Sequence, residues 1–137
     1  MSVADTAALK TAIETVGSLN GHTFVTLVPA GTQTLPYVII HPSEGEDDTD
    51  RVTAPRYTSH PEFTLHIVGA SATSVQTVFG LLKTKFVVNG RPTAPSVSGR
   101  RNTRAYWRSP LPIQTDRDVT PWLVYQVVEF GWVSDPA

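Results

Sequence analysis

Residues 62–86, EFTLHIVGASATSVQTVFGLLKTKF, join a strand pattern directly to a helix pattern. The first eight positions alternate between apolar and more polar side chains, which is typical of a half-buried strand. Its apolar face consists of Phe63, Leu65 and Ile67. After Ser71 or Ser74, either of which can cap a helix, apolar residues recur at helical spacing. These are Val75, Val78, Phe79, Leu82 and Phe86. This stretch therefore predicts that strands and helices share one core.

The flanking sequence predicts one more helix and four more strands. A helix is expected over residues 3–16, where Leu9, Ala12, Ile13 and Val16 form one stripe. Strands are expected over residues 22–29, 37–41, 106–118 and 120–134. Pro110 and Pro112 interrupt the third of these, as an edge strand allows. The order α-β-β-β-α-β-β predicts a single α+β domain over residues 1–137, with a largely antiparallel or mixed sheet of four to five strands.

The composition narrows the classes of function. The chain has no cysteine, which excludes disulfides and thiolate chemistry. A formal net charge of −1 gives no overall attraction to nucleic acid or to an anionic membrane. No apolar run approaches the roughly 18 residues of a membrane span, and the N-terminus lacks the pattern of a signal peptide. We therefore expect a soluble protein without a membrane partner.

Residues 41–51, HPSEGEDDTDR, concentrate five carboxylates in an expected long loop. They are Glu44, Glu46, Asp47, Asp48 and Asp50. A calcium loop of the EF-hand type needs Gly at its sixth position and Glu at its twelfth. Counting from either Glu44 or Glu46 puts other residues at both positions. A solvated loop, a polar interface and adventitious binding of a divalent ion remain open as interpretations of this acidic segment.

Motifs of the common catalytic sites are missing from the sequence. It contains no HExxH, no GxSxG, no phosphate loop and no GxGxxG. Its four histidines do not follow the spacing of a metal site. We therefore expect neither an enzyme nor a protein that needs a metal or another cofactor.

Residues 83–108 carry seven cations and no acid, and four of the cations lie in a second long connection, residues 87–104. The cations are Lys83, Lys85, Arg91, Arg100, Arg101, Arg104 and Arg108. Tyr106 and Trp107 lie among them, and Arg interleaved with aromatic residues is typical of a nucleic-acid contact. A flexible Arg-rich loop that meets the acidic segment of a neighbouring copy explains the same residues. The near-neutral net charge favours the second interpretation.

Four stretches together resemble a known family. They are the N-terminal helix, LPYVIIHPSEG at residues 35–45, FTLHIVGASATSVQTVFGLLKTKF at residues 63–86, and TPWLVYQVVEFGWVS at residues 120–134. In order, length and texture they resemble the tail-terminator (tail-completion) proteins of long-tailed bacteriophages, especially phages of actinobacteria. The neighbouring alternative is a neck or head-completion protein of the same virion.

The resemblance implies a virion protein that is assembled in the host cytoplasm. Its subunits would form a hexameric ring on the head-proximal end of the tail tube, stop tube polymerisation and join the tail to the head connector. The implied partners are other copies of this chain, the tail-tube protein, the head–tail connector protein and genomic DNA that passes through the channel without sequence-specific binding. No catalytic residue is required for this role.

A ring gives the two charged segments a physical role. Neighbouring subunits of a ring meet through two different patches, so the acidic segment could face the basic segment of the next copy. The arginines proposed for this interface are Arg91, Arg100, Arg101, Arg104 and Arg108. Alternatively, the acidic segment could line the channel and repel DNA phosphates. Apolar anchors would supply most of the affinity. The candidate anchors are Tyr57, Trp107, Trp122 and Trp132.

Overall fold

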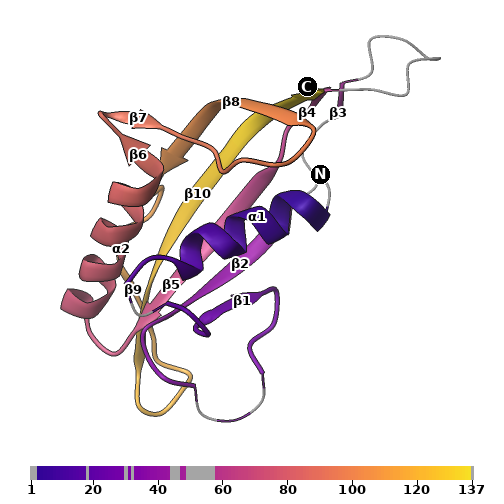
Figure 1. Cartoon of the computed structure of the whole chain (residues 1–137). Coiled ribbons are helices and arrows are strands. Elements are labelled where there is room, and N and C mark those ends of the chain that lie inside the picture. The colour runs from indigo at the N-terminus through magenta and orange to yellow at the C-terminus, as the bar shows by residue number, and fades with distance from the viewer. Residues whose placement is uncertain are drawn as a thin grey trace.

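The computed structural model describes residues 3–17, 19–29, 31, 33–43, 47–48 and 58–136. Two helices, α1 (Val3–Glu14) and α2 (Ala72–Phe86), lie on one face of a twisted sheet (Figure 1). The strands are β1 (Thr23–Val25), β2 (Tyr37–Ser43), β3 (Asp47–Asp48), β4 (Thr58–Ser59), β5 (Glu62–Gly69), β6 (Val87–Val88), β7 (Arg91–Pro92), β8 (Arg100–Arg108), β9 (Gln114–Asp116) and β10 (Leu123–Pro136). The expected α+β class is confirmed.

The long strand β10 is the centre of the main sheet. β5 and β4 pair with one edge of β10 in a single register, so they form one strand that is interrupted at His60 and Pro61. β8 and β9 pair with the other edge and are separated by the segment with Pro110 and Pro112, as the sequence predicts. β2 is antiparallel to β5, β3 is antiparallel to β4, and β1 is parallel to β2. β2 and β3 lie one after the other along the outer edge of the interrupted β5–β4 strand. If each interrupted strand is counted once, the main sheet has five strands side by side, in agreement with the four to five expected.

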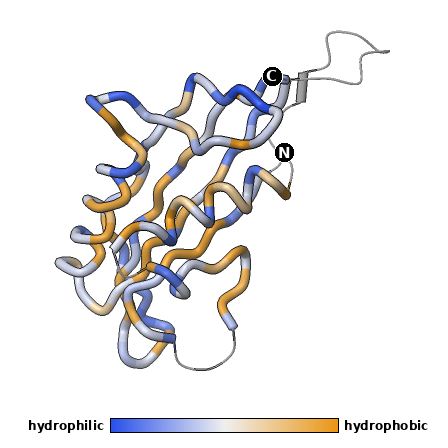
Figure 2. Tube along the Cα trace, viewed as in Figure 1, coloured by the Kyte–Doolittle hydropathy of each residue, from blue (hydrophilic) through white to orange (hydrophobic). Residues whose placement is uncertain are grey.

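Both helices pack on the same face of the sheet. The predicted apolar face of β5 is buried completely or nearly so, and it aligns with Val38 and Ile40 of β2 and with Val128 and Phe130 of β10. The helices cover this face with Leu9 and Ile13 from α1 and with the apolar stripe of α2. Figure 2 shows hydrophobic residues along the middle of these elements. Burying one such side chain contributes roughly 1.5–3 kcal/mol to stability, so this layer holds the fold together.

Two local signals in the sequence are confirmed. Ser71 caps α2, because its side-chain oxygen accepts a hydrogen bond from the backbone N–H of Ser74 at 3.2 Å. Asn89 and Gly90 both adopt positive φ, at 52° and 75°, and close the hairpin of β6 and β7. That is the backbone geometry for which Asn-Gly is favoured in two-residue hairpins.

Four expectations are corrected. α1 ends at Glu14 instead of residue 16, and Asp5, expected away from the apolar stripe, is buried. The strand expected over residues 22–29 is limited to β1. Thr26 turns the chain with a φ of 65°, and the N–H of Leu27 donates to the carbonyl of Val25 at 2.7 Å. The connection expected as a flexible Arg-rich loop contains the β6–β7 hairpin and the first part of β8.

Candidate functional site

The acidic and basic segments reach opposite edges of one end of the sheet. At this end Ser134 of β10 pairs with Ser59 of β4 on one side and with Asn102 of β8 on the other. β3 pairs with the far side of β4, so the strand order is β3-β4-β10-β8. Adjacent strands are about 4.8 Å apart, which separates β3 from β8 by roughly 14 Å. The end of the sheet therefore carries acidic residues at one edge and arginines at the other.

The acidic edge is described only in part. Asp47 and Asp48 form β3 and pair with Ser59 and Thr58, so these two positions belong to a strand and not to a loop. Glu44, Glu46 and Asp50 lie outside the described residues. The proposed contact or channel role of this segment remains a prediction.

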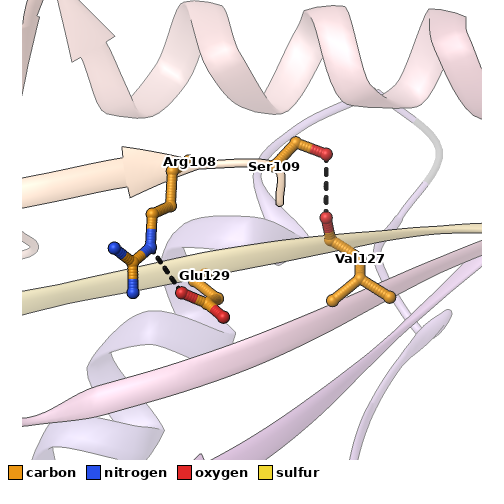
Figure 3. Close-up of polar contacts among 4 residues, drawn as sticks. All are labelled: Arg108, Ser109, Val127 and Glu129. Atoms are coloured by element: carbon orange, nitrogen blue, oxygen red, sulfur yellow. Dashed lines mark hydrogen bonds and ion pairs between the residues drawn. The ribbon is translucent and has the colours of Figure 1, made fainter. Parts of the chain in front are cut away.

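Two of the five arginines proposed for the interface are engaged within their own subunit. The Arg108 guanidinium forms an ion pair with Glu129 on the adjacent strand, next to the Ser109 hydroxyl that donates to the Val127 carbonyl (Figure 3). Arg100 donates to the hydroxyl and to the carbonyl oxygen of Ser134, at 2.9 and 2.7 Å. These two side chains fasten β8 to β10, and this local use reduces their availability to a neighbour.

Arg101 and Arg104 are exposed and form no ion pair with another described residue. They line a pocket of about 660 Å³ together with Thr58, His60, Thr103, Val133 and Asp135. Asp135 lies opposite Arg101 in the strand pairing, but its carboxylate accepts a hydrogen bond from the Thr58 hydroxyl at 2.6 Å. Two guanidinium groups and one carboxylate leave this Arg101–Arg104 pocket with an excess of positive charge.

A β-bulge places Arg104 in the pocket. The register between β8 and β10 shifts by one residue, so that Arg104 and Ala105 together lie opposite Trp132. Ala105 packs against the core, whereas Arg104 is exposed and has a φ of 51°. Positive φ is disfavoured for a side chain such as Arg, by roughly 1–2 kcal/mol. Such strain is characteristic of functional positions and of bulges that redirect a side chain.

The remaining interface arginine and the candidate anchors lie in different environments. Arg91 is an exposed residue of the β6–β7 hairpin. Trp132 is only 2% exposed and stacks on Phe63, so the structure corrects its assignment as an anchor for a neighbour: it belongs to the core. Trp107 is half-buried against Phe86, with ring centroids 5.8 Å apart.

Trp122 has the environment expected of an anchor. It is 57% exposed, and the Arg117 guanidinium lies 5.0 Å from its ring centroid. The fourth candidate, Tyr57, lies outside the described residues. Among the candidate anchors that the structure describes, Trp122 is therefore the most exposed.

The face of the sheet opposite the helices carries residues that sequence reasoning did not assign to a site. In the described part of the chain, no helix covers this face. The rings of His41 and His66 pack edge to face, with their centroids 4.7 Å apart. The centroid of the Tyr125 ring lies 5.8 Å from that of His66. Burial lowers the pKa of His66 below its usual value of about 6.5, and the nearby His41 lowers it further. His60, Thr58 and Asp135 of the Arg101–Arg104 pocket were likewise missed, because only the strand register brings them together.

The described residues contain neither a metal site nor a membrane-spanning helix. No group of three or more His, Asp or Glu there is arranged to hold a metal ion. No helix among them is long and apolar enough to cross a membrane.

Comparison with known proteins identifies a fold. No family model and no curated protein sequence matches the chain. Chains of solved structures do match, and one belongs to the virion of a native gene transfer agent particle. The alignment covers 97% of this chain and 99% of that chain, with a TM-score of 0.60 and 17% sequence identity. Over nearly its whole length, the fold is therefore similar to that of a chain of this virion particle.

Proposed function

We propose that this protein is a structural protein of a phage-like virion that caps the head-proximal end of the tail tube as a hexameric ring. The observation that carries the proposal is the fold similarity to a chain of a gene transfer agent virion, which extends over nearly all of both chains. The resemblance of the sequence to tail-terminator proteins selects the position within the virion. A ring subunit acts through its surfaces and needs no cofactor.

The distribution of charge supports a ring. A closed ring repeats one contact between two different patches, and a patch of each sign lies at opposite edges of the same sheet end. Electrostatic matching of this kind sets the register of the subunits and increases their rate of encounter. The other proposed partners are the tail-tube protein on one face of the ring and the head–tail connector protein on the other.

The acidic segment could serve the subunit contact or the channel for genomic DNA, and the two roles predict different results. Neutralising Glu46, Asp47 and Asp48 weakens ring formation if the segment forms the contact, and salt weakens the wild-type ring as well. A channel role predicts normal rings with altered genome ejection. Normal rings with normal ejection would contradict both roles.

Purified protein mixed with tail-tube protein tests the proposal. We expect mass measurement and electron microscopy to show tubes of limited length that carry a ring at one end. The protein alone can remain monomeric, since the tube end can be required for the ring to form. A protein that never binds or caps tubes would contradict the tail-terminator role. Binding to the head connector in place of tubes would identify a neck or head-completion protein.

A sequence-independent nucleic-acid-binding module is the second candidate, because Arg101 and Arg104 have no ion-pair partner among the described residues. A gel shift with double-stranded DNA at increasing salt distinguishes it. Phosphate contacts make log affinity fall linearly with log salt, in proportion to the number of phosphates bound. We expect no such dependence, because no binding is expected near physiological salt.

A further inference from the structure

We infer that the Arg101–Arg104 pocket binds carboxylates of the acidic segment, residues 44–50, of a second copy of this chain. The β3 edge of one copy would then meet the β8 edge of the next. The inference rests on the proposed ring and specifies which surfaces close it.

The charges of the pocket fit a carboxylate guest. The guanidinium groups of Arg101 and Arg104 have no ion-pair partner among the described residues, and Arg presents several N–H donors in a planar fork that suits carboxylates. The one carboxylate of the pocket, Asp135, accepts a hydrogen bond from Thr58. Thr103 and His60 add polar groups to the wall. An acidic chain can therefore enter and meet net positive charge.

Within one subunit, the arginine wall of the pocket on β8 and the acidic strand β3 lie at opposite edges of the sheet, although the other wall, with Thr58, borders β3 directly. β4 and β10 lie between β3 and β8, so the backbone of Asp47 and Asp48 is roughly 14 Å from β8 of the same copy. Both β3 and β8 are edge strands at this end, since neither pairs with a second strand among the described residues. A neighbouring copy can approach each edge from outside, and this is the geometry of a head-to-tail contact.

The strain at Arg104 points in the same direction. Without the bulge, β8 would have no extra residue there, and Ala105 would still fill its place against the core. The bulge adds an arginine beside Arg101 at the expense of a positive φ. A fold that needed only to be stable would gain from the regular strand.

A protein carboxylate fits the pocket better than the phosphates of a nucleic acid. Non-specific binding to DNA relies on several phosphate contacts along a basic surface. Here the carboxylate-bearing Asp135 of β10 lies directly opposite Arg101 of β8, and Arg100 and Arg108 are engaged with Ser134 and Glu129. The acidic segment, in contrast, supplies five carboxylates in seven positions.

Charge reversal with mutual rescue tests the inference. One variant carries Arg101→Glu and Arg104→Glu. The other reverses all five charges of the acidic segment with Glu44→Arg, Glu46→Arg, Asp47→Arg, Asp48→Arg and Asp50→Arg. Each places like charges on both sides of every contact, so we expect the yield of tube-bound rings to fall roughly tenfold or more for each variant alone. In an equimolar mixture, each reversed edge meets its complement. Rings of alternating subunits should form, since a hexamer closes with an even number.

The matched control carries Lys83→Glu and Lys85→Glu, which change the net charge as much as the arginine variant does. Both lysines are exposed in the last turn of α2, and neither is one of the five proposed interface arginines or lines the Arg101–Arg104 pocket, so this control should form rings like the wild type. Thermal unfolding of each variant checks the fold, and rescue in the mixture shows independently that both are folded.

The outcomes separate the two proposals. Wild-type protein that never caps tubes overturns the proposed function itself. Wild-type rings, together with reversed variants that also form rings alone, overturn only the inference about the interface. Loss of rings without rescue in the mixture does the same. If reversal of the two arginines abolishes DNA binding and leaves the ring intact, the pocket serves nucleic acid.

Discussion

The side chain of Tyr106 in β8 lies against the backbone of Gly131 in β10, its direct partner across the sheet. A Cβ at position 131 would lie 2.7 Å from the Tyr106 hydroxyl oxygen and 2.8 Å from the carbonyl oxygen of Pro61. Because Gly131 has no side chain, the Tyr106 ring can approach its backbone from one side and the Pro61 carbonyl can approach it from the other. The same carbonyl of Pro61 accepts a hydrogen bond from the N–H of Trp132 at 3.1 Å, where the line of β4 and β5 is interrupted.

Gly131→Ala is expected to destabilise the protein by about 1–3 kcal/mol, because the new methyl group must displace either Tyr106 or the backbone at Pro61. Thermal or urea unfolding measures the loss. Gly80→Ala is the matched control: Gly80 lies exposed in α2, and nothing approaches its Cβ position within 4 Å. That change should stabilise the helix by about 0.5–1 kcal/mol. Similar stability changes for both variants would contradict the packing described.

The sequence was sufficient to predict those elements for which the apolar periodicity and the residues at the ends indicate the same structure. The alternation in β5, the stripe and cap of α2 and the Asn89-Gly90 turn all reflect local chemistry, and all are confirmed. The end of β1 was not predictable in the same way, because Thr26 is β-branched and adopts a φ of 65° against its intrinsic preference. Tertiary context determined that turn.

The candidate site was predictable only in its charges. The sequence shows an acidic and a basic segment, but it does not show that Arg108 pairs with Glu129, or that a bulge exposes Arg104. Both facts depend on the register of β8 against β10. For Trp132, a usable signal was present: it continues the alternation of Val128 and Phe130, which marks the buried face of β10.

Trp132 and Trp122 should respond to truncation in opposite ways. Trp132→Ala removes the ring that stacks on Phe63 and contacts Phe130, and we expect a loss of about 3–5 kcal/mol in unfolding free energy. Trp122→Ala removes an exposed ring and should change stability by no more than about 0.5 kcal/mol. Chemical denaturation measures both changes in stability. Tube capping by the folded Trp122→Ala variant tests whether the Trp122 side chain is an anchor. Unimpaired capping would exclude it.

The stability of the protein should fall in mild acid because of His66. Its pKa is lowered by burial and by His41, so in the unfolded chain the group binds a proton at higher pH than in the folded protein. The contribution of neutral His66 is complete above the unfolded value of about 6.5 and is lost as the pH falls from there toward the lower folded pKa. Below the folded pKa the loss no longer increases. Unfolding free energy measured between about pH 8 and pH 5 should show this decline.

His66→Asn should reduce that pH dependence, since the variant keeps a polar side chain of similar size but has no titrating group. His22→Asn is the control, because His22 precedes β1, whose first residue Thr23 pairs with Val38, three residues along β2 from His41. An unchanged slope in the His66 variant would assign the acid sensitivity to other groups.

Replacing Arg104 should raise the stability of the subunit and lower its capacity to assemble. Arg104→Gly removes the strain of a φ of 51° and is expected to stabilise the isolated subunit by about 1 kcal/mol, while it removes one guanidinium from the pocket. Arg101→Gly removes an equivalent charge from a position without positive φ, where glycine costs a strand about 0.5–1 kcal/mol. Urea unfolding should separate the two variants by sign, whereas both should lower the yield of rings on tubes. A stabilised Arg104 variant that forms rings as well as the wild type would show that the bulge exists for a reason other than the subunit contact.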